Sequence, residues 1–153
     1  MAKEGEAAPG AAWINADGGK GSVADHKGRK LVVYFYPKDD TTGCTNEAKD
    51  FTALLGEFSK AGTDVVGISK DSVKKHSKFI EKYDLKHALG SDESGEVCEA
   101  FGVWVEKSLY GRQYMGIERA TFLIGADGRI ARVWHKVKVA GHAAQVLEAA
   151  KAL

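Results

Sequence analysis

The chain has 153 residues and a formal net charge of +1, with 44% hydrophobic and 28% charged residues. This balance is typical of a soluble globular domain and gives no indication of a nucleic-acid or membrane partner. No stretch approaches the roughly 18 apolar residues of a membrane span. The N-terminus has no basic region followed by an apolar run, so we expect a cytoplasmic protein without a secretory signal.

Apolar runs and turn residues alternate along the chain in a way that predicts both strands and helices. Leu31–Tyr36 is apolar on both faces, which predicts a fully buried strand. Apolar residues after Cys44 recur at helical spacing as far as Ala61-Gly62. The other elements we expect are a hairpin pairing 13–14 with 22–23, strand 64–69, a helix after Asp71-Ser72, a strand near 87–89, a short helix 94–101, a hairpin of 119–124 with 129–135, and a C-terminal helix.

This order of elements indicates one α/β domain over residues 1–153, with a few flexible residues at its N-terminus. Strands that alternate with helices favour a central, mostly parallel sheet with helices on both faces, and the final hairpin adds an antiparallel edge. A thioredoxin-like fold satisfies that order. In open α/β sheets the active site lies at the carboxyl ends of the strands, which is where the sequence places Cys44.

Cys44 is the most informative residue, because it follows a buried strand at the point where a helix begins. The unpaired backbone N–H groups at a helix start carry positive partial charge and stabilise a thiolate, which is the reactive form of cysteine. A lone cysteine after a strand is nevertheless more often a small buried apolar residue than a nucleophile. The residues around Cys44 must therefore decide between these two interpretations.

Those residues resemble the peroxiredoxins, and most closely their Q-type, or bacterioferritin-comigratory, subfamily. The resemblance runs in register from about Pro9 to the C-terminal helix. It implies an antioxidant enzyme of cell redox homeostasis that reduces hydrogen peroxide and small organic hydroperoxides through a sulfenic acid on Cys44. The matching segments are Tyr36–Glu47 with its Pro-x3-Thr-x2-Cys pattern, Met115–Ile124 as the family's arginine-bearing strand, and Asp92–Glu96 with Phe101–Trp104.

The resemblance also implies a role for each site residue. Arg119 would stabilise the Cys44 thiolate and the charge on the departing oxygen. The Thr41 hydroxyl would donate to the sulfur or to the peroxide while accepting from the other. Taken singly, each of these residues also has an ordinary structural explanation, such as a helix cap or an edge-strand charge. The remaining expected site residues are Pro37 as a rigid apolar wall, Gly43 as a backbone donor to the peroxide, and Glu47 as a bidentate partner that orients Arg119.

Two positions depart from the subfamily pattern. Many Q-type members carry a resolving cysteine five residues after the peroxidatic one, and here that position is Lys49. We expect the second thiol, Cys98, to be a packed helix residue rather than a resolving cysteine, so we predict a one-cysteine mechanism. Thr42 stands where the subfamily usually has proline, which should loosen the loop before Cys44 slightly.

The expected partners are a peroxide substrate and a reductant, which the family supplies as thioredoxin, glutaredoxin or a small thiol. We expect no metal and no cofactor, because the five histidines show no metal-ligand spacing. We expect a monomer or a weak homodimer. Two alternatives stay open: a thioredoxin-like thiol-disulfide oxidoreductase, although Cys-x-x-Cys is absent, and a redox sensor whose sulfenic acid signals to a partner.

Overall fold

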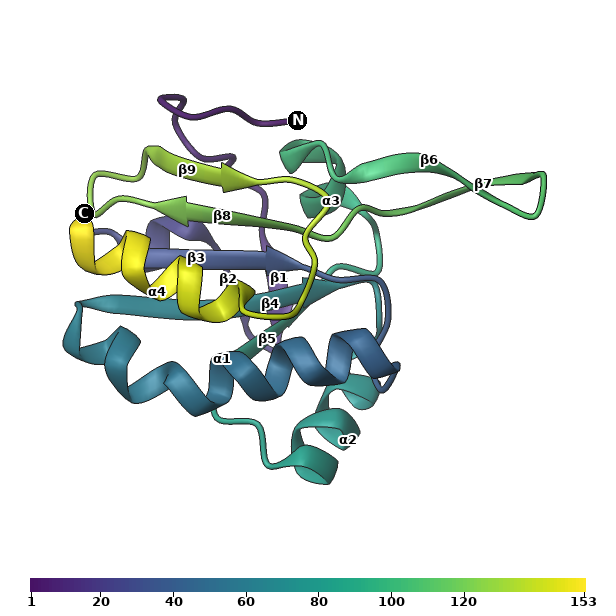
Figure 1. Ribbon diagram of the computed structural model, residues 1–153, viewed down its shortest axis with the longest axis horizontal. Coiled ribbons are helices and arrows are strands. Elements are labelled where there is room, and N and C mark those ends of the chain that lie inside the picture. Colours follow the sequence, from purple (N-terminus) through teal and green to yellow (C-terminus); the bar gives the residue numbers. More distant parts are fainter.

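The computed structural model describes residues 1–153 and shows a seven-stranded sheet with helices on both faces (Figure 1). The strands of this sheet are β1 (Trp13–Asn15), β2 (Lys20–Gly21), β3 (Lys30–Phe35), β4 (Thr63–Ser69), β5 (Ala88–Ser91), β8 (Ala120–Ile124) and β9 (Ile130–Trp134). The helices are η1 (Val23–His26, a 3-10 helix), α1 (Thr42–Lys60), α2 (Val73–Tyr83), α3 (Glu96–Phe101) and α4 (His142–Ala152). A separate hairpin consists of β6 (Trp104–Leu109) and β7 (Arg112–Ile117).

The strand order in the large sheet is β2-β1-β5-β4-β3-β8-β9. Its three central strands run parallel, because β3 pairs with β4 and β4 pairs with β5 in that sense. Antiparallel strands flank them on both sides: β1 next to β5, and β8 next to β3. The predicted parallel centre and the antiparallel edge hairpin of β8 and β9 are both confirmed.

Two layers of apolar side chains, each of 16 buried residues, cover the two faces of this sheet. Alternate residues of β3 enter opposite layers, since side chains alternate along a strand. Val32 and Tyr34 join the layer covered by α1, α2 and α4, whereas Val33 and Phe35 join the layer that contains α3. This explains why the whole of the predicted buried strand is apolar.

α1 begins immediately after the loop that leaves β3. Thr41 is its N-cap, with extended backbone angles (φ −92°, ψ 156°). The first helical hydrogen bond of α1 runs from the Thr45 N–H to the Thr41 carbonyl at 2.8 Å, so the N–H groups of Gly43 and Cys44 precede it and have no partner within the helix. The predicted end of the helix is confirmed, with Gly62 at φ +67° just beyond it.

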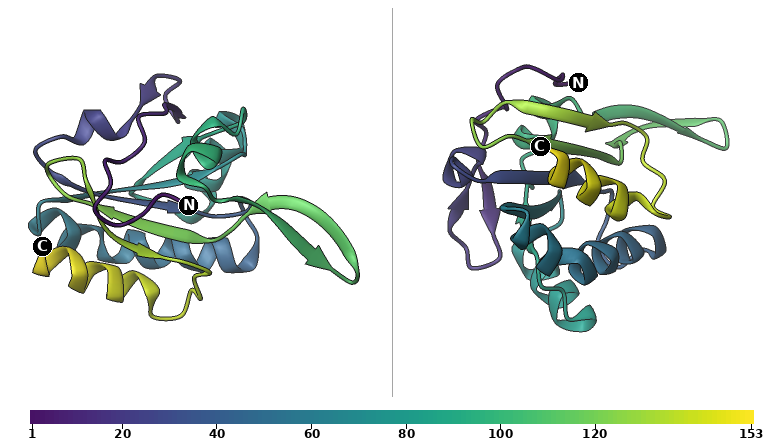
Figure 2. Two further views of the ribbon diagram at one scale, coloured as in Figure 1. Left: turned by 90° about the horizontal axis from the view of Figure 1, so that it is seen from above. Right: turned by 60° about the vertical axis from the view of Figure 1, so that its left-hand side comes forward.

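The β6–β7 hairpin was not predicted from the sequence, and it projects away from the body of the molecule (Figure 2). Most of its residues are exposed or only partly buried, so they lack the apolar alternation of a packed strand. Its turn is Tyr110-Gly111, with both residues at positive φ, in place of the usual Asn-Gly or Asp-Gly signal. The segment Met115–Ile124 that resembles the family's arginine-bearing strand spans the end of β7 and the whole of β8, and the predicted strand 119–124 corresponds to β8.

The N-terminal hairpin also differs by two residues from the prediction. β1 pairs with Lys20–Gly21 rather than with 22–23. Ser22 instead starts η1, where it forms a capping box with Asp25. This reciprocal cap takes Ser22 and Val23 out of the strand.

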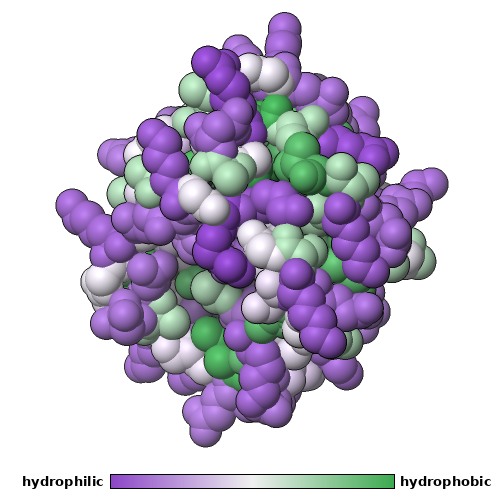
Figure 3. Space-filling view, turned by 90° about the vertical axis from the view of Figure 1, so that its left-hand side faces the viewer, coloured by the Kyte–Doolittle hydropathy of each residue, from purple (hydrophilic) through white to green (hydrophobic).

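The surface in Figure 3 is mostly hydrophilic, with small and separate apolar patches. No helix of the structure combines the length and the apolar character that crossing a membrane requires. Exposed large apolar side chains are concentrated on the β6–β7 hairpin, namely Leu109, Tyr110, Tyr114 and Met115, with Met1 and Leu153 at the chain ends.

Candidate active site

The pairing of β3 with β8 explains how Arg119 comes close to Cys44, although 75 positions separate the two residues. Phe35, the last residue of β3, pairs with Ala120, the first residue of β8, in the antiparallel sense. Arg119 directly precedes Ala120 and therefore lies beside the loop that leaves β3. Cys44 follows that loop in the first turn of α1. The site thus lies at the carboxyl end of β3, as predicted.

The guanidinium of Arg119 contacts both Cys44 and Glu47. Arg119 Nη2 lies 3.4 Å from Cys44 Sγ, and Nη1 donates to Glu47 Oε1 at 2.6 Å. Cys44 and Glu47 are buried, and the Arg119 side chain is 18% exposed. The expected bidentate pair is wrong, since only one glutamate oxygen is bonded and Oε2 is buried without a hydrogen-bond partner.

Burial also changes the acidity of Glu47. It raises the pKa of the carboxyl group to about 7, although the charge and the hydrogen bond of Arg119 oppose this shift. The Glu47 carboxyl group therefore changes its charge near neutral pH. Such a group beside the guanidinium makes the electrostatics of the site dependent on pH in the physiological range.

Thr41 and Pro37 both lie in the exposed part of the loop. The Thr41 hydroxyl donates to the Lys38 carbonyl oxygen at 2.8 Å. Its hydrogen is therefore already used, in contrast to the expected donation to the sulfur or the peroxide. The lone pairs of the Thr41 oxygen stay free to accept a hydrogen bond.

Gly43 gives the Arg119 guanidinium room to approach the start of α1. A Cβ atom on Gly43 would lie 3.2 Å from Arg119 Nη2, which is closer than nine in ten real Cβ contacts. The absence of a side chain at Gly43 therefore helps to bring the guanidinium within reach of Cys44 Sγ. Sequence reasoning named Gly43 only for its backbone N–H group.

Cys98 belongs to the opposite layer of the molecule. It packs in the apolar layer that contains α3, whereas Cys44 packs in the layer under α1 and α4. Burial raises the pKa of the Cys98 thiol far above its ordinary value, and the Asp92 carboxylate adds to this effect. Cys98 therefore stays a protonated and enclosed thiol, which agrees with its expected place as a packed helix residue.

Sequence reasoning missed a buried polar cluster next to the Cys44 loop. Asp39, Asp71 and His76 meet there, from the loop, the end of β4 and α2. No periodicity reveals such a cluster, because its members come from separate elements. The one available signal was Asp39 itself, which stands inside the segment that resembles the peroxiredoxin loop.

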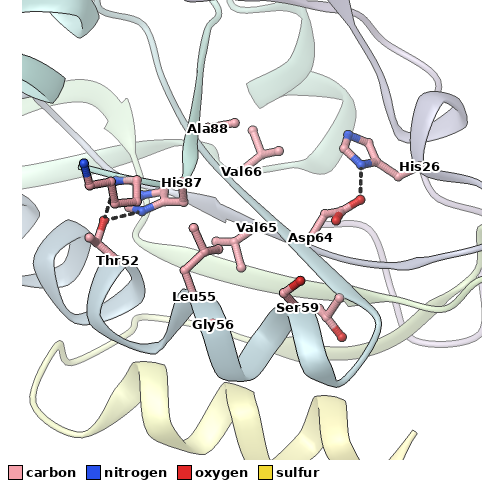
Figure 4. Close-up of a pocket in the computed structure, with 12 residues that line it drawn as sticks. His26, Thr52, Leu55, Gly56, Ser59, Asp64, Val65, Val66, His87 and Ala88 are labelled. Atoms are coloured by element: carbon pink, nitrogen blue, oxygen red, sulfur yellow. Dashed lines mark hydrogen bonds and ion pairs between the residues drawn. The ribbon is translucent and has the colours of Figure 1, made fainter. Parts of the chain in front are cut away.

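A cavity of about 720 Å³, shown in Figure 4, has no residue of the Cys44 loop in its lining. It runs along the second half of α1, and Leu55 and Val65 line it. Leu55 comes eleven residues after Cys44, which corresponds to about 16 Å along a helix. Thr52 Oγ1 and His87 Nδ1, 2.8 Å apart, form one end of this cavity. The cavity is therefore separate from the Arg119–Cys44 contact.

Comparison with known proteins identifies the family. The sequence model of the AhpC/TSA family matches residues 5–133. The chain belongs to the AhpC/TSA family. A putative peroxiredoxin Bcp of Coxiella burnetii is 55% identical over 126 residues, which cover 82% of this chain and 83% of that protein. The peroxiredoxin Bcp of Escherichia coli is 46% identical over 140 residues, which cover 92% of this chain and 90% of that protein.

Solved structures agree with this assignment. Xanthomonas campestris peroxiredoxin Q superimposes with a TM-score of 0.89 at 48% identity, over 93% of this chain and 90% of that one. A cysteine-to-serine mutant of Xylella fastidiosa PrxQ gives a TM-score of 0.94 at 38% identity, over 99% and 97% of the two chains. The predicted thioredoxin-like fold and the predicted Q-type, or Bcp, peroxiredoxin subfamily are confirmed. The protein is a thiol-dependent peroxidase.

Proposed function

We propose that Cys44 is the peroxidatic residue of this enzyme, and that it reduces hydrogen peroxide and small organic hydroperoxides by a one-cysteine mechanism. The observation that carries the proposal is the 3.4 Å contact between Arg119 Nη2 and Cys44 Sγ at the first turn of α1. A cation and a helix N-terminus at one sulfur are the two features that stabilise a thiolate.

In the proposed reaction, the Cys44 thiolate attacks one peroxide oxygen. An S–O bond forms, the O–O bond breaks, and its electron pair leaves on the second oxygen as hydroxide or alkoxide, which then takes up a proton. Arg119 stabilises the negative charge on that departing oxygen. The N–H groups of Gly43 and Cys44 orient the peroxide, and the Thr41 oxygen accepts a hydrogen bond from the peroxide O–H. Pro37 forms an apolar wall beside the peroxide.

The sulfenic acid on Cys44 is then reduced by an external thiol. That thiol attacks the Cys44 sulfur and releases water, and a second thiol resolves the mixed disulfide and regenerates Cys44. The burial of Cys98 in the opposite apolar layer supports an external reductant, and so does the exposed Lys49 at the position where many relatives have a cysteine. Thioredoxin, glutaredoxin or a small thiol in the reducing cytoplasm fits the role of this external reductant. We propose that the enzyme acts as a monomer or a weak homodimer.

Organic hydroperoxides are included because of one structural relative. A structure of the bacterioferritin comigratory protein of Xanthomonas campestris, 48% identical to this chain, was described in terms of that protein's alkyl peroxide reduction activity. Chemistry at the sulfur is the same for both peroxide classes, since only the departing group differs. We therefore propose both classes as substrates here.

The test combines turnover with chemical trapping of the sulfenic acid. Wild-type enzyme should consume hydrogen peroxide and cumene hydroperoxide when either dithiothreitol or a thioredoxin system is supplied, and Cys44→Ser should consume neither. Mass spectrometry after dimedone treatment should place the adduct on Cys44. Oxidation of Cys44 without turnover would favour a redox sensor. An adduct on Cys98, or activity in Cys44→Ser, would overturn the proposal.

A further inference from the structure

Asp39 is a buried acidic residue in the middle of an exposed loop. Its neighbours Pro37, Lys38, Asp40 and Thr41 are all exposed, whereas Asp39 is only 8% exposed. Burying a carboxylate is unfavourable unless hydrogen bonds or charges compensate for the lost water. The contacts of Asp39 therefore show what holds this loop against the body of the protein.

Asp39 makes three polar contacts, each with a different element. Its Oδ1 accepts a hydrogen bond from the Tyr36 hydroxyl at 2.6 Å, and its Oδ2 lies 2.6 Å from His76 Nδ1. Its backbone N–H donates to Asp71 Oδ2 at 2.8 Å, and the same Asp71 oxygen accepts from the Ser69 hydroxyl at 2.7 Å. The loop is thereby connected to the end of β3, the end of β4 and α2.

His76 links this cluster to β5. Its Nε2 lies 3.0 Å from the Gly90 carbonyl oxygen, which only accepts, so Nε2 carries a hydrogen. A proton must then also lie between Nδ1 and Asp39 Oδ2, either on the imidazole ring or on the carboxyl group. His76 is fully buried and the Asp39 side chain is 6% exposed, so water has little access to this contact. The Asp39–His76 contact is therefore a short hydrogen bond in a largely buried setting.

The ligand-type atoms of Asp39, Asp71 and His76 lie within 4.8 Å of one another, a spacing that would also suit a metal ion. Hydrogen bonds already account for those atoms, because Asp39 Oδ2 faces His76 Nδ1 and Asp71 Oδ2 accepts two donors. The cluster is complete without a cation, and its chemistry is that of a structural hydrogen-bond network.

A second set of contacts between the same loop and α2, made by Asp40, is much more exposed. Asp40 bonds to Lys82 Nζ at 2.8 Å and to the Tyr83 hydroxyl, and the Lys82 and Asp40 side chains are 59% and 43% exposed. Exposed ion pairs contribute little, because water and salt screen them. The buried Asp39–His76 contact is therefore the principal attachment of the loop to α2.

We propose that Asp39 and His76 are positioning residues for the peroxidase reaction, which hold the loop so that Thr41 and Cys44 keep their reactive geometry. The proposal rests on the proposed role of Cys44. The chain passes from Asp39 to Thr41, the N-cap of α1, and Cys44 lies in the first turn of that helix. Movement of Asp39 therefore displaces the donors and acceptors that the peroxide contacts, and displacements near 1 Å are costly for catalysis.

The first test compares two substitutions of Asp39. Asp39→Ala removes both side-chain contacts, and we expect the second-order rate constant of Cys44 oxidation by hydrogen peroxide to fall at least about tenfold. Asp39→Asn keeps the shape and the Tyr36 contact, and its amide donates to Nδ1 of a neutral His76. We expect its rate constant to stay within about threefold of wild type. Rescue by asparagine separates positioning by hydrogen bonds from any need for a negative charge.

The second test uses a matched buried histidine as its control. His87 also bonds through both ring nitrogens, to the Tyr34 hydroxyl at 2.7 Å and to Thr52 Oγ1 at 2.8 Å. Figure 4 shows the second of these bonds. Neither of these hydrogen bonds involves the loop. His76→Phe should slow Cys44 oxidation at least about tenfold, whereas His87→Phe should stay within about threefold of wild type.

Hydrogen–deuterium exchange supplies a readout that does not depend on activity. The Asp39 amide is bonded to Asp71, so the peptide that covers residues 37–44 should lose protection in Asp39→Ala and His76→Phe but not in His87→Phe or Asp39→Asn. Unchanged rate constants in Asp39→Ala would overturn the proposal, as would equal losses in the two histidine variants. If His76→Phe does not fold, the comparison of Asp39→Ala with Asp39→Asn still tests whether Asp39 positions the loop. A wild-type enzyme whose Cys44 does not react with peroxide would instead defeat the proposed function.

Discussion

The guanidinium of Arg119 forms hydrogen bonds with two side chains of α1, those of Glu47 and Cys44. Nη1 donates to Glu47 Oε1 at 2.6 Å, and Nη2 faces Cys44 Sγ at 3.4 Å. The shorter contact fixes one side of the planar group, so the position of the other side follows from it. Small changes at the start of α1 should therefore act on Cys44 through Arg119.

Gly43→Ala tests this steric dependence. The added Cβ would lie 3.2 Å from Arg119 Nη2, so the guanidinium must shift by a few tenths of an ångström. We expect the rate constant of Cys44 oxidation, measured by stopped flow, to fall about three- to tenfold. The free energy of unfolding should stay equal or rise by up to about 1 kcal/mol, because alanine favours helices.

Gly56→Ala is the control for this substitution. Gly56 lies in the same helix, and a Cβ atom added there would have no neighbour within 4 Å. Gly56→Ala should raise the free energy of unfolding without lowering the rate constant of Cys44 oxidation. Equal oxidation rates in the two alanine variants would contradict the steric role of Gly43.

Glu47→Gln tests the effect of burial on the glutamate. The pKa of Glu47 rises from 4.5 to about 7 on folding, so the folded state binds more protons than the unfolded state between these values. The favourable contribution of Glu47 to the free energy of unfolding is complete below pH 4.5 and is lost as the pH rises through 7. The loss amounts to about 3 kcal/mol of unfolding free energy, and Glu47→Gln should abolish it.

Urea unfolding of both proteins at pH 5 and pH 8 measures this effect. His87 and His142 titrate in the same range with the opposite sign, since burial lowers the pKa of each to about 4. The difference between variant and wild type therefore isolates Glu47. The unfolding free energy of Glu47→Gln relative to wild type should rise by about 2 to 3 kcal/mol from pH 5 to pH 8. A constant difference would contradict the raised pKa.

At the scale of one element, the first turn of α1 determines how the loop presents Cys44. Thr42 occupies the first helical position, where a backbone N–H has no partner within the helix and where proline is favoured. The preceding Thr41 has extended backbone angles, which are those that a residue before proline requires. The position therefore accepts proline without loss of a helical hydrogen bond.

Thr42→Pro should accordingly stabilise the protein. We expect a gain of about 0.4–1 kcal/mol, because proline restricts the unfolded chain. For a chain of this size the gain corresponds to a rise in the melting temperature of about 1–4 °C. Differential scanning calorimetry measures it, with peroxide turnover recorded in parallel. A lower melting temperature would show that the backbone at Thr42 does not fit proline.

The elements that sequence reasoning predicted correctly are those with strong local patterns. β3 is apolar throughout because both of its faces are buried, and α2 begins at Ser72, whose side chain accepts from the Lys75 N–H. The β6–β7 hairpin was missed because its residues contact mostly solvent, so burial left no pattern in the sequence.

The presence or absence of a pattern in the sequence also explains which residues of the candidate site could be predicted. Cys44, Thr41 and Arg119 were named as site residues through their resemblance to a family motif, and not through local periodicity, and the structure brings Arg119 to Cys44. The partner of Asp39 could not be predicted in this way, because His76 lies 37 residues further along and only the packing of α2 brings the two together.

At the scale of the whole molecule, the sheet separates the two thiols. Cys44 and Cys98 belong to the apolar layers on opposite faces of the sheet. A disulfide requires Cα atoms within about 7 Å, so joining two residues in different layers would require the chain around them to rearrange. This separation supports the proposed one-cysteine mechanism, in which the reductant approaches Cys44 from outside.

Cys98→Ser tests this separation. We expect peroxide turnover with dithiothreitol or thioredoxin to stay within about twofold of wild type, because the proposed one-cysteine mechanism gives Cys98 no part in the cycle. Non-reducing peptide mass spectrometry of the wild-type enzyme after one equivalent of peroxide should show no dominant Cys44–Cys98 linkage. Loss of turnover in Cys98→Ser together with such a linkage would establish Cys98 as the resolving residue.

The rate constant of Cys44 oxidation by hydrogen peroxide, with and without Arg119, shows whether the guanidinium activates the sulfur. Arg119→Met is made in the Glu47→Gln background, so that no buried Glu47 carboxylate is left without its partner. Stopped-flow measurement should give a value about 100-fold or more below that of Glu47→Gln alone, as expected when a donor to the departing oxygen is removed. Equal rate constants in the two proteins would show that Arg119 does not activate the sulfur.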